Sequence, residues 1–255
     1  VDSERLRPSL DFVGLTVVDP KAKHCHTKTI PCMTPGFSTC PHNAGTDSSP
    51  GITDKGLCVR DAVAMRELVP PDPPLAGLHV ALRPFRIGDA AAIAKSCRDP
   101  DIPRFTTMPD ALTEARARQW IETGLEWWPR GLARFAVTVP PSDECAGQMG
   151  IQLDLAARRA EAFYWLDRRV RGRGIAVEAL DLVAQWAFRD HGTVRAQVVT
   201  HLDNERSQRV AERCGFSREG VLRAWEPVKD DQPDVVMWSR LATDPAPIWA
   251  TRSGA

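Results

Sequence analysis

The chain has 255 residues, with 33 basic and 33 acidic side chains and a pI near 7.1, so it lacks the basic excess that is typical of nucleic-acid scaffolds. No apolar run approaches the roughly 20 residues of a membrane-spanning helix, and no signal-peptide core opens the chain, so we predict a cytoplasmic protein that does not enter a membrane. The seven cysteines are odd in number and irregularly spaced, which disfavours a closed disulfide framework.

The first part of the chain differs in composition from the rest. Residues 1–64 contain only two aromatic residues, Phe12 and Phe37, and are rich in Pro, Thr, Ser, Gly, Lys and Asp. Such a segment buries too little apolar surface to offset its ordering entropy. A stiff linker, Pro70–Pro74, follows it. The predicted organisation is an extension and Pro-rich linker over residues 1–77 that is disordered or non-native, a main domain over residues 78–242 and a loose tail over residues 243–255.

That extension is expected to be poorly structured. Because the chain opens on Val1, Met65 is a second candidate start, which would make residues 1–64 an upstream addition. The extension also holds a group of potential zinc ligands, namely Cys25, Cys32, Cys40, Cys58, His24, His26 and His42. They include no Cys-x-x-Cys knuckle and match no common zinc module, so we predict no metal site, with a metal-binding interaction protein as a remote alternative.

From Leu78 the pattern becomes that of an α/β domain. Apolar periodicity and capping residues predict the following elements in its first half: a strand over His79–Arg83, a helix over Ala90–Cys97 capped by Asp89, a helix over Thr113–Trp128, and strands over Ala133–Val139, Gly147–Leu155 and Ala160–Leu166. The last three strands are separated by short connections, so we expect them to form an antiparallel meander.

The second half alternates helices and strands. Its predicted elements are a helix over Ile175–Arg189 that stops at Gly192, a strand over Val194–Thr200, a helix over Asn204–Cys214, and strands over Phe216–Glu226 and Val235–Leu241. The strand–helix–strand order implies one parallel pair within a mixed sheet. The predicted fold class is α/β (α+β), with a mostly antiparallel central sheet, a parallel strand pair and flanking helices.

The junction between the strand at Ala160–Leu166 and the next helix carries the most specific motif, Arg169-Val170-Arg171-Gly172-Arg173-Gly174. Glycines without a Cβ let a phosphate approach the main chain, and the helix dipole and the arginines add positive potential. The motif fits neither the dinucleotide fingerprint nor the Walker loop. It therefore predicts a pyrophosphate site, with a solvated surface turn as the alternative.

This Arg-x-x-Gly-x-Gly spacing resembles the acyl-coenzyme A loop of the GNAT superfamily of N-acetyltransferases. Further segments resemble the ribosomal-protein-alanine N-acetyltransferases of that superfamily: Leu82–Phe85, Tyr164–Asp167, Asn204–Ser207, Val210–Glu212, Gly215-Phe216 and Glu219-Gly220. The likeness covers roughly residues 78–242, with its motifs in the expected order.

The resemblance implies acetyl-CoA as the co-substrate, with pantetheine between two splayed parallel strands and the pyrophosphate on the glycine loop. The residues implied in cofactor binding are Trp165, Leu166, Asp167, Arg169, Val170, Arg171, Gly172, Arg173, Gly174, Ile175, Asn204 and Ser207. A main-chain N–H near Trp165–Asp167 would also face the acetyl carbonyl, where negative charge develops. Asn204 is equally suited to cap its helix.

The resemblance also implies a catalytic acid and a catalytic base. Many GNAT enzymes protonate the departing thiolate with a tyrosine, but this chain has Ala211 at the matching position, and its only tyrosine is Tyr164. Ser207 is therefore the candidate acid, and the alternative is a helix hydroxyl that bonds to the backbone. Glu226 is the candidate base for the substrate ammonium, and the alternative is an exposed edge-strand carboxylate.

Two other ionisable groups compete for the role of base. Glu178 lies in the first turn of the phosphate-binding helix, so we assign it to the helix dipole. His201 follows a central strand and is the weaker rival. Cys214 precedes Gly215-Phe216 and is expected to be packed, which leaves no cysteine suited to a covalent acetyl intermediate.

The sequence thus predicts an N-acetyltransferase that works by direct transfer within a ternary complex. The acceptor is a primary amine: a peptide N-terminus, an aminoglycoside-like molecule or another small amine. An acidic rim would attract a cationic acceptor, and its candidates are Asp101, Glu122, Glu126, Glu226 and Asp230. The alternative is a non-catalytic acyl-CoA-binding regulatory module. Exposed sheet edges are compatible with a homodimer.

Overall fold

The computed structural model describes residues 68–225, 227–247 and 249. Glu226, the candidate base, lies outside the described residues, as do the candidate zinc ligands of the extension. Within the described ranges, no helix is both long and apolar enough to cross a membrane.

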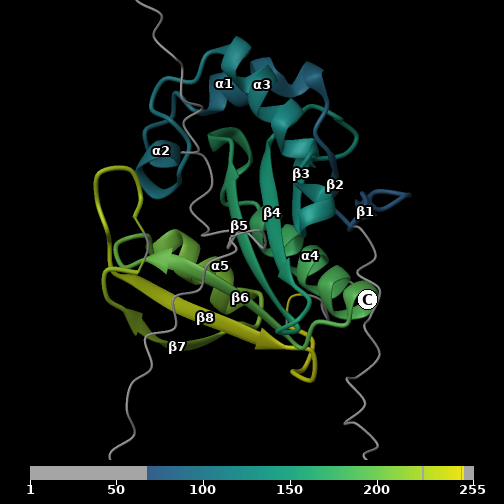
Figure 1. The fold of residues 1–255 in the computed structure, drawn as a ribbon, viewed down its shortest axis with the longest axis vertical. Coiled ribbons are helices and arrows are strands. Elements are labelled where there is room, and N and C mark those ends of the chain that lie inside the picture. The colour runs from purple at the N-terminus through teal and green to yellow at the C-terminus, as the bar shows by residue number, and fades with distance from the viewer. Residues whose placement is uncertain (1–67, 226, 248, 250–255) are drawn as a thin grey trace, which may run out of the picture. The chain divides into compact units, whose positions relative to one another are not determined.

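An eight-stranded sheet with the order β1-β2-β3-β4-β5-β6-β8-β7 forms the centre of the domain (Figure 1). Its strands are β1 (Leu75–Ala76), β2 (Ala81–Pro84), β3 (Leu132–Thr138), β4 (Gly147–Asp154), β5 (Arg159–Leu166), β6 (Arg195–His201), β7 (Ser217–Leu222) and β8 (Val235–Leu241). Each neighbouring pair is antiparallel except β5 and β6, which are parallel. The predicted meander, β3-β4-β5, and the predicted parallel pair are both confirmed.

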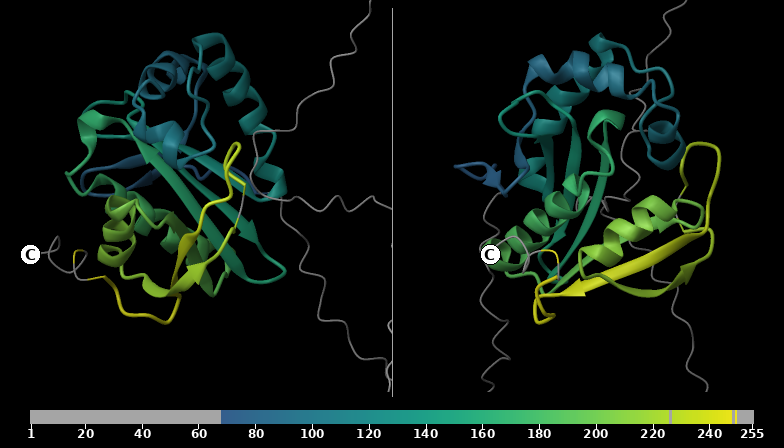
Figure 2. Two further views of the ribbon diagram at one scale, coloured as in Figure 1. Left: turned by 90° about the vertical axis from the view of Figure 1, so that its left-hand side faces the viewer. Right: turned by 180° about the vertical axis from the view of Figure 1, so that it is seen from behind.

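Helices cover the two faces of the sheet. The helices are α1 (Ala90–Ser96), α2 (Asp101–Phe105), α3 (Glu114–Leu125), α4 (Ile175–His191) and α5 (Glu205–Arg213). Apolar residues of α1 and α3 form one core cluster with Phe85, just after β2, and with the strand residues Ala136 and Trp165. The larger cluster lies on the opposite face and contains the apolar residues of α4 and α5 (Figure 2, right). Successive strand residues point to opposite faces, which is why both faces of the middle strands are apolar.

The parallel strands β5 and β6 diverge soon after they begin. Their paired residues run only from Arg159 with Arg195 to Glu161 with Gln197. Beyond that point β5 continues along β4 as far as Leu166, while β6 continues along β8 as far as His201. Figure 1 shows β5 rising toward α1 and α2 while β6 turns away from it. The sheet therefore opens into a gap between the carboxyl ends of these two strands.

Several element boundaries differ from the expectations. Strand β7 ends at Leu222, so Trp225 lies beyond it and is exposed. Helix α3 ends at Leu125, and Trp128 begins a separate 3-10 turn that places its ring in the core. Thr113 caps α3 as predicted, since its Oγ1 accepts the N–H of Arg116 at 3.3 Å. Helix α2 was not predicted, because five residues are too few to show a helical period.

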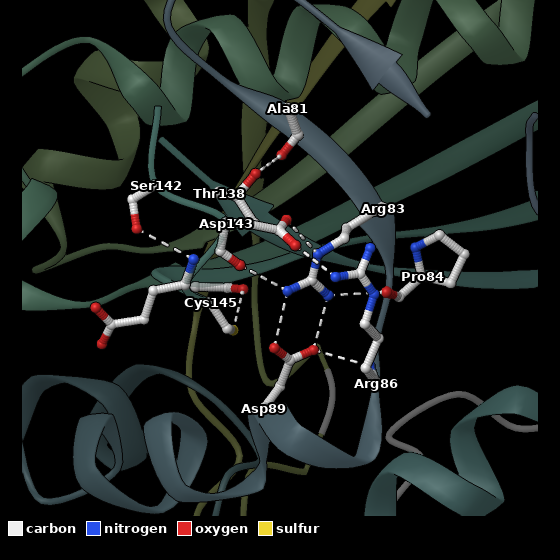
Figure 3. Close-up of polar contacts among 11 residues, drawn as sticks. Ala81, Arg83, Pro84, Arg86, Asp89, Thr138, Ser142, Asp143 and Cys145 are labelled. Atoms are coloured by element: carbon white, nitrogen blue, oxygen red, sulfur yellow. Dashed lines mark hydrogen bonds and ion pairs between the residues drawn. The ribbon is translucent and has the colours of Figure 1, made fainter. Parts of the chain in front are cut away.

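Asp89 does not cap α1 with its side chain, in contrast to the expectation. Its carboxylate accepts two hydrogen bonds from the Arg83 guanidinium, at 2.8 and 2.9 Å, and one from the Arg86 backbone N–H (Figure 3). Asp143 accepts a further bond from Arg83 Nε at 2.8 Å, and these hydrogen bonds hold the pKa of Arg83 above its usual value. The pair with Asp89 is buried and joins β2 to the start of α1, so this arginine of the Leu82–Phe85 motif has a structural role.

Part of the predicted extension contacts the domain. Leu68 is buried in the same core cluster as α4, and β1 pairs with β2. The boundaries drawn at residues 77 and 242 stay predictions.

Candidate functional site

The glycine loop joins β5 to α4 at the open end of the gap. After β5 the chain makes a 3-10 turn over Arg168–Val170, passes Gly172 and Gly174, and enters α4 at Ile175. Both glycines have a left-handed backbone, with φ of 76° and 82°, and a Cβ at either position would meet no atom within 4 Å. The backbone therefore needs glycine there, and the space beside it is open. The free N–H groups of the first turn of α4 adjoin this space and can hold an anion.

Asp167 organises the loop from its N-terminal side. Its carboxylate accepts hydrogen bonds from the Arg169 backbone N–H at 2.8 Å, from Arg169 Nε at 2.9 Å and from the Ser96 hydroxyl at 2.8 Å. Burial opposes ionisation, but these bonds outweigh it and lower the pKa of Asp167 to about 2. Asp167 was predicted to bind the cofactor directly. Its side-chain contacts hold the loop in shape, and its contact with the cofactor stays a prediction.

The arginines of the loop divide into two groups. Arg171 donates from Nε to the Leu166 carbonyl at 2.9 Å, and its guanidinium also pairs with Asp99 and Asp101 at 2.9 and 3.2 Å. The Arg171 side chain therefore points toward the residues just before α2 and at its start. Arg168 and Arg173 are exposed, and within the described ranges their side chains form no ion pair, so they are the cations available to a phosphate.

The main-chain groups that face the gap follow from the pairing of β5 with β4. The Asp167 N–H donates to the Ala146 carbonyl at 2.8 Å, so in this antiparallel ladder the N–H groups of Asp167 and Trp165 point toward β4. Those of Tyr164 and Leu166 point the opposite way, toward β6, which no longer pairs with β5 at that level. Of the predicted residues Trp165, Leu166 and Asp167, only Leu166 directs its amide into the gap, and the second such amide belongs to Tyr164.

Helix α5 brings the predicted residues Asn204 and Ser207 to the same gap. Asn204 Oδ1 accepts the N–H of Ser207 at 3.2 Å, so the capping role foreseen for Asn204 is present. The Ser207 hydroxyl oxygen lies 2.7 Å from the phenol oxygen of Tyr164. Sequence reasoning missed this tyrosine as a site residue. The available signal was its place on β5 two residues before Leu166, which puts both residues on one face and both amides on one edge.

The competing ionisable groups have other surroundings. Glu178 is buried, accepts the His79 backbone N–H at 2.9 Å and lies 3.3 Å from His79 Nδ1, so it holds the turn between β1 and β2. His201 packs edge-on against Phe105 of α2, and burial lowers its pKa. Cys214 is fully buried, and burial raises its pKa, so it stays a thiol and is packed as expected.

A pocket of about 590 Å³ lies between α2 and the hairpin that connects β7 to β8. It is lined by Cys97, Arg98, Pro100, Pro103, Arg104, Asp110, Val228, Lys229, Asp230 and Asp231. Arg104 pairs with Asp203, just beyond β6, at 2.6 Å, and Lys229 of the hairpin pairs with Asp110 at 2.8 Å. The pocket thus adjoins the β6 side of the gap.

The charge of this pocket differs from the predicted acidic rim. Three cationic and three acidic side chains line it, so the charges balance. Asp230 is among them, but Glu122 and Glu126 are exposed residues outside the lining. Asp101 pairs with Arg171 at 3.2 Å and with Arg206 at 3.1 Å, so its charge is already compensated.

Comparison with known proteins gives consistent matches. The family described as "Acetyltransferase (GNAT) domain" matches residues 79–217. The uncharacterized N-acetyltransferase p20 of Bacillus licheniformis is 28% identical over 165 residues, which are 64% of this chain and 93% of that protein. The ribosomal-protein-serine acetyltransferase of Escherichia coli (strain K12) is 29% identical over 131 residues, 51% of this chain and 72% of that protein.

Solved structures share the fold at lower identity. The microcin C7 self-immunity acetyltransferase MccE, in complex with acetyl-CoA and AMP, is 21% identical with a TM-score of 0.60, over 69% of this chain and 98% of that one. At this identity the likeness concerns the fold alone.

Proposed function

The chain belongs to the GNAT acetyltransferase family and is an acetyl-CoA-dependent N-acetyltransferase, and we propose that it transfers the acetyl group directly to a primary amine within a ternary complex. The observation that carries this proposal is the gap between β5 and β6. The glycine loop lies at its open end, and the amides of Leu166 and Tyr164 face into it. A single elongated ligand with a pyrophosphate at one end and amides along its length suits these groups.

The residues proposed to hold acetyl-CoA follow the chain from the gap to the loop. The amides of Tyr164 and Leu166 would pair with pantetheine, as a strand does. The N–H groups from Val170 to Ile175 would hold the pyrophosphate, with Arg168 and Arg173 as its exposed counter-ions. Asp167, Arg169 and Arg171 act by fixing the loop. An added Cβ at Gly174 would meet no atom within 4 Å, and this open space supports the approach of a phosphate to the main chain.

In the proposed reaction, Glu226 removes a proton from the acceptor ammonium, and the neutral amine nitrogen attacks the thioester carbonyl carbon. An amide at the gap, that of Leu166 or Tyr164, stabilises the negative charge that develops on the carbonyl oxygen. The C–S bond then breaks, the sulfur keeps the electron pair, and the Ser207 hydroxyl stabilises the resulting thiolate. The buried, protonated state of Cys214 supports direct transfer without an acetyl-cysteine.

The pocket between α2 and the β7–β8 hairpin is the proposed entrance for the amine. Its cationic and acidic side chains are equal in number, so it lacks the acidic excess that would attract a polycationic aminoglycoside, which favours an acceptor with one amine. We therefore place a peptide N-terminus first, and the name of the ribosomal-protein-serine acetyltransferase of E. coli likewise gives a protein as the acceptor. Small amines with one positive charge come second.

Calorimetric binding of acetyl-CoA to the whole chain tests the cofactor site. The wild type should bind in the micromolar range, and Gly174→Trp should weaken binding at least 100-fold, because the indole would occupy the pyrophosphate position. Gly192→Trp is the matched control, since Gly192 has φ of 63°, equally open surroundings and a place at the opposite end of α4. An equal loss in both variants, or no binding to the wild type, would contradict the proposal.

An acceptor screen tests the reaction itself. With acetyl-CoA bound, thiol release should accelerate when peptides with free N-termini are added, and peptides with blocked N-termini should have no effect. Binding of acetyl-CoA without turnover on any peptide or small amine would favour the alternative, a regulatory acyl-CoA-binding module.

A further inference from the structure

Tyr164 and Ser207 form a contact that the reaction as proposed does not yet use. Tyr164 is the only tyrosine of the chain, and it lies in the part of β5 that has no partner on β6. Its phenol oxygen is 2.7 Å from Ser207 Oγ, across 43 residues of sequence. The ring packs against the core cluster that contains Ala211, one helical turn beyond Ser207. The phenol of Tyr164 on β5 therefore contacts α5. The helix itself carries Ala211 at the position where many GNAT enzymes have a tyrosine.

The surroundings of Ser207 leave few orientations for its hydroxyl group. The Asn204 side chain fixes the Ser207 backbone by accepting its N–H at 3.2 Å. Within the described ranges, Tyr164 is the only hydrogen-bond partner of Ser207 Oγ, so the hydroxyl does not bond back to the helix carbonyls. In this structure the Ser207 hydroxyl is therefore bonded to the phenol of Tyr164.

The relative acidity of the two hydroxyl groups indicates which of them donates the hydrogen bond. A phenol, with an ordinary pKa of about 10, is a stronger donor than an aliphatic hydroxyl. When the phenol proton points at Ser207 Oγ, the serine proton must point elsewhere. Tyr164 lies in the part of β5 that borders the gap between β5 and β6, so the gap is the side to which we assign the serine proton.

We infer that Tyr164 is a positioning residue that donates its phenol proton to Ser207 Oγ and thereby directs the Ser207 hydroxyl proton at the sulfur of coenzyme A. This inference rests on the proposed function, because it requires the thiol to lie in the gap. When the C–S bond breaks, the sulfur takes the electron pair, and Ser207 donates a charge-assisted hydrogen bond to the thiolate. The thiolate later takes up the proton that the acceptor amine released.

The relative acidities explain why the tyrosine keeps its proton. Burial raises the pKa of Tyr164 above its ordinary value, whereas an ordinary thiol has a pKa of about 8.5. Complete transfer of the phenol proton to the thiolate would be uphill. A chain of two hydrogen bonds stabilises the thiolate without that step.

The test measures the pKa of the thiol of bound CoA, followed by the ultraviolet absorbance of its thiolate, so no acceptor is needed. Ser207→Ala should raise this pKa by about one unit, since a charge-assisted hydrogen bond is lost. Tyr164→Phe should raise it by about half as much, and Tyr164→Phe/Ser207→Ala should match Ser207→Ala alone. Ser207→Thr keeps the hydroxyl and should restore the wild-type value.

The control is Ser239→Ala, which removes a hydroxyl of β8 that is bonded to Glu219 at 2.6 Å and not to Tyr164 or Ser207, and should leave the thiol pKa unchanged. A wild-type thiol pKa in Tyr164→Phe, or additive shifts in the double variant, would overturn the inference. If the wild type does not bind CoA, the proposed function falls as well. If CoA binds and Ser207→Ala has no effect, only the inference about the pair falls.

A second measurement avoids any change at Tyr164. Because the chain has one tyrosine, ¹³C labelling of its Cζ gives a single resonance. That resonance should shift as the thiol of bound CoA titrates, and Ser207→Ala should abolish the shift. A resonance that ignores the thiol titration in the wild type would contradict the inference.

Discussion

The glycine loop and the pocket beside α2 lie on two sides of one gap, but they are held in place by different forces. The loop is shaped by a buried carboxylate, Asp167, whose partners Arg169 and Ser96 are tightly bonded to it. The pocket is closed by two pairs, Arg104–Asp203 and Lys229–Asp110, in which most side chains are well exposed to solvent. Exposed ion pairs contribute only about 0–1 kcal/mol each and weaken with salt.

This difference indicates that the glycine loop, on the cofactor side of the gap, is rigid. The pocket, on the side proposed for the acceptor, can adapt its shape. A buried hydrogen-bonded carboxylate fixes one loop conformation, because each alternative leaves a charge unpaired. Weak surface pairs allow the β7–β8 hairpin to adjust to the acceptor at little cost. Asp101 of α2 links the loop to α5, since it pairs with Arg171 of the loop and with Arg206 of α5.

The largest effect is expected on the acceptor side, from Glu226→Gln. Loss of the proposed base should lower kcat at least 100-fold while the affinity for acetyl-CoA changes less than twofold. Steady-state kinetics with an active peptide and calorimetry measure the two quantities. Glu212→Gln, at an exposed position of α5, serves as the control. A loss of acetyl-CoA affinity that parallels the loss of kcat would show that the two sides are not separable.

An intermediate effect is expected on the cofactor side, from Asp167→Asn. Removing the charge should weaken acetyl-CoA binding about tenfold and lower the free energy of unfolding by about 2 kcal/mol at pH 7. The folded-state pKa of about 2 lies below the ordinary 3.8, so the stabilisation is present above pH 4 and is lost as the pH falls toward 2. Urea unfolding at several pH values measures this.

The control for that experiment is Asp190→Asn, an exposed position at the other end of α4. The difference in stability between wild type and Asp167→Asn should shrink between pH 4 and pH 2. A difference that stays constant with pH would mean that the carboxylate contributes by shape and not by charge.

The smallest effect is expected from Lys229→Ala, which removes the pair between the hairpin and Asp110. The free energy of unfolding should fall by less than about 1 kcal/mol, and 1 M NaCl should abolish the difference. The KM for the acceptor should change no more than about threefold. A loss above 2 kcal/mol that persists in salt would show that the hairpin is as rigid as the glycine loop.

Much of the fold could be predicted from the chain alone. The meander β3-β4-β5, the long helix α4 with its left-handed Gly192, and the parallel pair all followed from periodicity, caps and element order. Errors occurred where local signals are weak. Helix α2 is too short to show a period, and β7 ends at Leu222 although the apolar residues Ala224 and Trp225 follow shortly after it.

The candidate site, like the fold, has parts that the sequence predicts and parts that it does not. By itself the sequence determined the glycine loop and the capped start of α5, because a backbone turn and a cap depend on residues a few positions apart. Only the tertiary structure decided that β5 and β6 separate after Glu161, that Leu166 and Tyr164 face the gap, and that Tyr164 meets Ser207. These depend on register and on the packing of α5 against the sheet, and no local pattern of residues encodes either.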